Sequence, residues 1–119
     1  MKNEDDHTDL PPTVEHSIEE WGGIPGLKRM KLERSVLDRL EKVYSLLSAK
    51  GRIEILYYLN FSPLTPGLIT DLTGMAPNLV SFHLRKLESV GVVESERRGR
   101  FLIYSITDLG RSLLGPLGG

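Results

Sequence analysis

The fold is decided by one stretch of sequence, Ala76-Pro77-Asn78-Leu79-Val80-Ser81-Phe82-His83-Leu84-Arg85-Lys86-Leu87-Glu88-Ser89-Val90-Gly91-Val92-Val93. Proline suits the first turn of a helix, where its missing N–H costs nothing, and glycine suits the residue after the last turn. We therefore expect a helix over residues 77–90 that stops at Gly91. Within it Val80, Leu84 and Leu87 recur at spacings of four and three, which places them on one buried face.

A shorter helix is expected just before this one. Thr65-Pro66 has the form of a helix start, with threonine as the N-cap and proline at the first helical position. The helix then ends at Thr73-Gly74, three residues before the next start. Two short helices joined by such a turn predict a helix-turn-helix unit.

The periodicity changes after Gly91. Residues 92–97 and 100–106 are rich in β-branched and aromatic side chains, and Arg98-Gly99 between them has the composition of a tight turn. This pattern predicts a β-hairpin. Thr107 then caps a last short helix, which we expect over residues 108–114.

The preceding part of the chain predicts two more helices. One covers residues 27–48, Gly51 interrupts the pattern, and the other covers residues 52–60. The apolar stripe of the first helix is wide enough to serve the protein's own core on one flank and a second chain on the other. The alternative is that the whole stripe faces its own core. Its members are Val36, Leu37, Leu40, Val43, Tyr44 and Leu47.

The expected fold class is α+β, a winged helix-turn-helix over residues 28–115, preceded by an acidic, flexible tail over residues 1–27. The tail has three prolines and no helical or strand period, although residues 14–20 could form one or two helical turns. It carries seven acidic side chains against one lysine, whereas residues 28–119 carry fourteen basic and nine acidic ones. The folded part is therefore basic, which favours a polyanionic partner.

Several classes of function are excluded by composition. The chain contains no cysteine, which rules out disulfides, thiolate metal sites and a cysteine nucleophile. No catalytic grouping of side chains and no phosphate-binding glycine loop is present, so we expect neither an enzyme nor a bound cofactor or metal. The acidic N-terminus lacks an apolar segment and no apolar run approaches membrane-spanning length, so a cytoplasmic protein is expected.

Three segments resemble the ArsR-type winged-helix transcription regulators. Residues 43–48 with 52–59 resemble the opening of their fold, and residues 79–93 resemble their recognition helix and its exit into the wing. Residues 104–110 are similar to a strand-to-helix join that is seen also in MarR- and PadR-like regulators. The resemblance covers roughly residues 36–114. It implies a dimeric regulator that binds specific sequences of double-stranded DNA.

The polar face of the helix over residues 77–90 is expected to enter the major groove, and the hairpin over residues 92–106 to contact the backbone or minor groove. Phe82 would touch thymine methyl groups there, or else be partly buried against the wing. The arginines of the hairpin would contact DNA or simply be solvated. The expected DNA-binding residues are Pro77, Asn78, Leu79, Ser81, Phe82, Arg85, Lys86, Arg97, Arg98 and Arg100.

A homodimer is expected to form through the first and last helices of the folded part. The runner-up function is a winged helix that binds other proteins, but the cationic helix face and hairpin argue against it. The predicted dimer residues are Val36, Leu37, Leu40, Tyr44, Leu113 and Leu114. No effector is indicated.

The histidine of the recognition helix has three possible roles. We expect His83 to be hydrogen-bonded and partly buried, because it adjoins the core residue Leu84; a phosphate contact is the alternative, and a metal ligand ranks last. Metal-sensing ArsR-type proteins use cysteines in the helix before the recognition helix, or histidines and carboxylates in the last helix. Residues 67–73 contain no cysteine and residues 108–114 no histidine, so metal sensing is not carried over.

Overall fold

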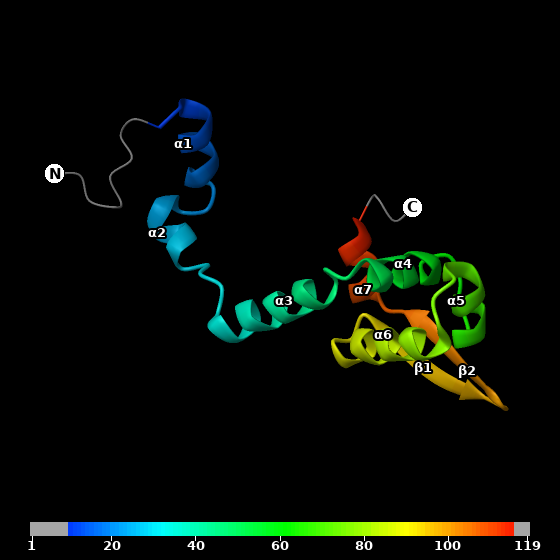
Figure 1. The fold of residues 1–119 in the computed structure, drawn as a ribbon. Helices are drawn as coiled ribbons and strands as arrows, with labels where there is room; N and C mark the ends of the chain where they lie inside the picture. Colours follow the sequence, from blue (N-terminus) through cyan, green and yellow to red (C-terminus); the bar gives the residue numbers. More distant parts are fainter. Residues whose placement is uncertain (1–9, 116–119) are drawn as a thin grey trace. The chain divides into compact units, whose positions relative to one another are not determined.

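The computed structural model describes residues 10–115. The chain divides into two compact units, and the boundary in the sequence lies between Leu37 and Asp38. Figure 1 shows the order of the elements. The helices and strands are α1 (Pro12–Glu19), α2 (Gly23–Lys28), α3 (Arg34–Leu46), α4 (Lys50–Leu59), α5 (Pro66–Thr73), α6 (Pro77–Ser89), β1 (Val93–Arg98), β2 (Phe101–Ile106) and α7 (Asp108–Leu114).

The N-terminal unit is more regular than the sequence predicted. Residues 14–20 were expected to form at most two turns, and α1 does so, but α2 follows where an irregular chain was expected. The physical reason lies in the glycines. Gly22 adopts the left-handed conformation with φ of +87°, and a Cβ on Gly26 would lie 1.8 Å from the Trp21 carbonyl oxygen, so these glycines permit a tight turn between two helices. The acidic residues 1–9 lie outside the described part, and flexibility of the tail stays a prediction.

The single helix predicted over residues 27–48 is wrong. Helix α2 ends at Lys28 and α3 begins at Arg34. Met30 and Lys31 donate their N–H groups to carbonyls three residues back, at Leu27 and Lys28, so the helical turn tightens and stops there. No proline or glycine marks this break, which is why periodicity alone misses it.

The C-terminal unit is a winged helix-turn-helix, as expected. Helices α4, α5 and α6 surround one core, and Val80, Leu84 and Leu87 on α6 are each fully buried in it. Thr65 accepts a hydrogen bond from the Leu68 N–H at 3.3 Å, so the predicted N-cap is confirmed. Figure 1 shows the hairpin extending beyond the helices of this unit, so its tip is free of them.

Strands β1 and β2 are antiparallel, with a register that runs from Val93 opposite Ile106 to Arg98 opposite Phe101. This register moves the two-residue turn to Gly99 and Arg100, one residue later than predicted. Gly99 has φ of +61°, which a hairpin turn of this length requires. The backbones of Leu64 and Tyr104 exchange two further hydrogen bonds, which attach the segment before α5 to the hairpin.

Gly51 was expected to interrupt the helical pattern, and this is wrong. Gly51 lies in the first turn of α4, which begins at Lys50. A Cβ at this position would lie 2.9 Å from His83 Nε2 and 3.1 Å from Met75 Sδ. The glycine therefore serves the close approach of α4 to α6 rather than a helix end.

Candidate nucleic-acid interface

The predicted DNA-reading face of α6 is open to solvent. Leu79 and Phe82 are each 42% exposed, and the polar and cationic members of the face are exposed as well, apart from half-buried Ser81. The opposite face packs into the core. The structure thus brings together on one surface Pro77, Asn78, Leu79, Ser81, Phe82, Arg85 and Lys86.

Phe82 lies between two cations. The Arg52 guanidinium carbon is 5.8 Å from the centre of its ring, and the Lys86 ammonium is 5.5 Å from it. One of these cations comes from α4 and the other from the next turn of α6. A half-exposed aromatic ring offers a base or a thymine methyl an apolar contact, and the Lys86 ammonium beside it can reach a phosphate.

The wing carries three exposed arginines around its turn, Arg97, Arg98 and Arg100. Arg98 pairs with Glu96, and the Arg100 guanidinium lies 5.3 Å from the centre of the Phe101 ring. The Arg98–Glu96 pair is exposed on both sides, and such pairs contribute little to stability, so the guanidinium can exchange its partner for a phosphate at small cost. Arg97 makes no ion pair within residues 10–115.

His83 is buried and hydrogen-bonded, as expected. Its exposed fraction is 9%, and its Nδ1 accepts a hydrogen bond from Arg52 Nε at 3.1 Å. An accepting Nδ1 puts the proton of the neutral ring on Nε2. Burial lowers the pKa of His83 below its usual 6.5, and the Arg52 charge lowers it further, so the ring is neutral at pH 7.

Sequence reasoning missed Arg52. Its Nη1 also donates to the Leu46 carbonyl oxygen at 3.0 Å, in the last turn of α3. Nothing in the spacing of Arg52 indicated this, because its partner His83 is 31 residues away in the chain. The contact depends on how α4 packs on α6.

Folding stability is expected to fall as the pH drops below about 6.5. The folded state lowers the pKa of His83, so on acidification the unfolded chain binds a proton at this residue before the folded protein does. The free energy of unfolding is therefore highest above the pKa of the unfolded chain. It falls as the pH drops, until the lower pKa of the folded protein is passed. Urea unfolding at fixed protein concentration between pH 7.5 and 5.5 measures this loss. H83Q should be less sensitive over the same range, and equal sensitivity of the two proteins would contradict the assignment.

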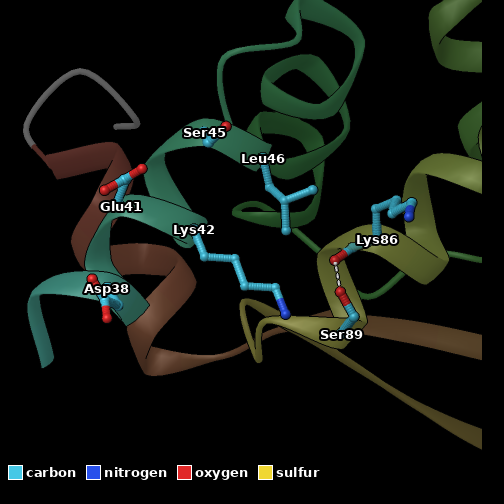
Figure 2. A pocket seen from close by; sticks show the side chains of 7 residues that line it. All are labelled: Asp38, Glu41, Lys42, Ser45, Leu46, Lys86 and Ser89. Atoms are coloured by element: carbon cyan, nitrogen blue, oxygen red, sulfur yellow. Dashed lines mark hydrogen bonds between the residues drawn. The ribbon is translucent and has the colours of Figure 1, made fainter. Parts of the chain in front are cut away.

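A charged hollow of about 700 Å³ lies between α3 and the second half of α6 (Figure 2). Asp38 and Glu41 approach it from α3 together with Lys42, and Lys86 approaches it from α6. Figure 2 shows Lys42 reaching from α3 toward Ser89, whose hydroxyl donates to the Lys86 carbonyl oxygen at 2.6 Å. Lys42 thus extends the positive surface of α6 onto α3, while the two acids bound it on the far side.

The predicted dimer residues are exposed apolar groups on α3 and half-buried ones on α7. Val36 and Leu37 belong to the N-terminal unit, and Leu40 and Tyr44 to the C-terminal unit, where Tyr44 is 60% exposed. A largely apolar groove brings Tyr44 together with Leu113 and Leu114. Ile53 and Tyr57 of α4 also line it and were missed, because the sequence suggested no role for the outer face of α4.

The fold, the open helix face and the arginine-rich hairpin define a winged helix-turn-helix DNA-binding domain. The family model described as "Bacterial regulatory protein, arsR family" matches residues 49–95. The HTH-type transcriptional regulator NmtR of Mycobacterium tuberculosis is 30% identical over 88 residues, which are 72% of this chain and 73% of NmtR. The chain belongs to the ArsR family of bacterial regulatory proteins, which confirms the resemblance seen in its sequence.

Further relatives agree with this assignment. The transcriptional repressor SmtB of M. tuberculosis is 35% identical over 75 residues, 63% of this chain and 56% of SmtB. A homodimeric winged helix-turn-helix domain of Mycobacterium bovis, described as a possible ArsR-family regulator, has a TM-score of 0.61 at 28% identity, covering 74% of this chain and 81% of that one. NolR of Sinorhizobium fredii, at 23% identity and a TM-score of 0.65 over 73% of this chain and 91% of its own, shares the fold. None of the described helices is long and apolar enough to span a membrane.

Proposed function

We propose that this chain binds specific sequences of double-stranded DNA as a homodimer and thereby regulates transcription. The observation that carries the proposal is the exposed face of α6, where Asn78, Phe82 and Arg85 stand clear of the core while Val80, Leu84 and Leu87 hold the helix from behind. Amide and guanidinium groups can make paired hydrogen bonds to adenine and guanine in the major groove. The arginines of the hairpin would contact the backbone or the adjacent minor groove.

Selection of bound duplexes from a random pool tests this function. The expected result is an enriched duplex with two inverted half-sites whose centres lie about one helical turn, or roughly 34–36 Å, apart, because a two-fold symmetric dimer presents two copies of α6. The double variant N78A/F82A, selected in parallel, is the control that should enrich nothing. Equal recovery of all sequences by the natural chain would contradict specific binding.

The dimer itself is proposed to form through the groove that Tyr44, Leu113 and Leu114 line, extended along α3 by Leu40. The homodimeric state described for the M. bovis relative supports a dimer here. Exposed apolar side chains in a groove lined by α3, α4 and α7 are suited to a symmetric contact with a second copy.

A charge in this groove should dissociate the dimer. Y44D would bury an unpaired carboxylate in the interface, and we expect the dimer dissociation constant to rise at least about tenfold, or ~1.4 kcal/mol, in sedimentation velocity. S45D is the matched control: the next residue on α3 lines the hollow of Figure 2 instead, so its dimer should persist. Dissociation of both variants alike, or of neither, would count against this interface.

A further inference from the structure

One guanidinium group connects three parts of the C-terminal unit. Arg52 Nη1 donates to the Leu46 carbonyl oxygen at the end of α3, Arg52 Nε donates to His83 Nδ1 in α6, and Arg52 Cζ lies 5.8 Å from the Phe82 ring. Arg52 itself is in the first turn of α4 and is half-buried. Its three neighbours are the last turn of one helix and two successive residues of another.

We infer that Arg52 is a positioning residue for DNA recognition: it fixes the Phe82 side of α6 against the end of α3, and it does so through a neutral His83. The inference rests on the proposed DNA-binding function of α6. It assigns to Arg52 an effect on specific binding without a contact to DNA. It also makes that effect sensitive to protonation of His83.

The local packing explains why this side chain has to be an arginine. Gly51 leaves room for the His83 ring, since a Cβ there would lie 2.9 Å from Nε2, and Met75 lies on the same side. In this close contact a planar guanidinium can donate from two different nitrogens while its central carbon lies 5.8 Å from the centre of the Phe82 ring. An ammonium group donates from a single nitrogen, so a lysine cannot reproduce two contacts that Arg52 makes from two different nitrogens.

Protonation of His83 would break this link. The Nδ1 atom would change from acceptor to donor and would then face a donor of the same charge. The charged group that contacts the His83 ring is Arg52 from α4; Lys86 on α6 lies against the neighbouring Phe82 ring, and Met75, which precedes α6, is neutral. Within the described residues, burial and Arg52 account for the lowered pKa, and no carboxylate opposes them.

The first experiment compares R52Q and R52K with R39Q, which removes the same charge from the exposed part of α3. Binding is measured by fluorescence anisotropy on the duplex that the natural chain selects and on a random duplex of the same length, over a series of salt concentrations. R52Q and R52K should weaken specific binding about 3- to 30-fold, with an unchanged salt slope and an unchanged affinity for random DNA. R39Q should stay within about twofold of the natural chain on both duplexes, as a distant surface change does.

Two results would overturn the inference. If R52Q weakens both duplexes equally and reduces the salt slope by about one, Arg52 is a phosphate contact. If R52Q binds the selected duplex as tightly as the natural chain does, Arg52 positions nothing. Failure of the natural chain to select any duplex refutes the proposed function instead, which keeps the two failures distinct.

The second experiment follows the His83 ring by NMR in the DNA-free protein, which tests the link without DNA. In R52Q the pKa of His83 should rise toward 6.5, while in R39Q it should match that of the natural chain. On the selected duplex, the natural chain should lose affinity as the pH falls below about 6.5. H83N, whose Oδ1 can take the place of Nδ1 and still accept from Arg52, should keep its affinity at pH 7.5 and lose this pH dependence. An unchanged His83 pKa in R52Q, or an unchanged pH profile in H83N, would refute the link.

Discussion

Replacing Leu84 by alanine should lower the free energy of unfolding by about 2–5 kcal/mol, the range found when a fully buried leucine is cut back in a core that cannot collapse. Leu84 is fully buried and lies on the inner face of α6, among core residues from α4, α5 and the hairpin. This loss of free energy has two parts: three carbon atoms are no longer buried, and a cavity is left beside the DNA-reading helix. Urea unfolding of the variant at fixed protein concentration measures it.

Leu79 on the same helix gives a matched control. Its side chain is 42% exposed, so L79A should change stability by no more than about 0.5 kcal/mol. The same variant should weaken binding to the selected duplex, because Leu79 belongs to the exposed face. Equal destabilisation by L84A and L79A would show that α6 is turned differently from the structure described here.

Replacing Phe82 or Asn78 by alanine should weaken binding to the selected duplex by about 1–3 kcal/mol and relax its sequence preference. Both side chains are exposed on α6, where they can reach base edges. In contrast, R98A and R100A should weaken binding to every duplex to a similar degree. Each lost phosphate contact should reduce the slope of log affinity against log salt by about 0.9.

Binding curves on the selected and the random duplex, at three or more salt concentrations, separate these two behaviours. The free energy of unfolding of each variant serves as the control, since all four positions are exposed and their replacement should leave stability nearly unchanged. If the helix variants and the wing variants show the same ratio of specific to random binding, the division into base-reading residues on α6 and phosphate-contacting residues on the wing is wrong.

Much of the candidate interface could be predicted because it depends on signals within a few residues. The spacing of Val80, Leu84 and Leu87 fixed which side of α6 is buried, and the exposed side then followed from the same helix. The wing arginines were found because the hairpin turn is local. The register of that turn was missed by one residue, since pairing across two strands depends on both strands at once.

The helix break at residues 29–33 and the role of Gly51 show the limit of this approach. The break occurs without proline or glycine, and Gly51, which looks like a helix end, lies inside α4. At Gly51 the packing of α4 against His83 and Met75 decides the backbone, whereas residues 29–33 are exposed and the break there is seen only in its tightened hydrogen bonds. Tertiary contacts commonly override propensities of this size.

By itself, then, the sequence determined the winged helix-turn-helix order, the Thr65 and Thr107 caps, the buried face of α6 and the family to which the chain belongs. The tertiary structure alone decided that Arg52 joins α3 to His83, and that Tyr44 shares a groove with the last helix. Caps and periodicity depend on residues at most four or so apart, which share a turn of helix. A contact between residues 31 apart depends on how closely two helices approach, and here a missing Cβ at Gly51 sets that approach.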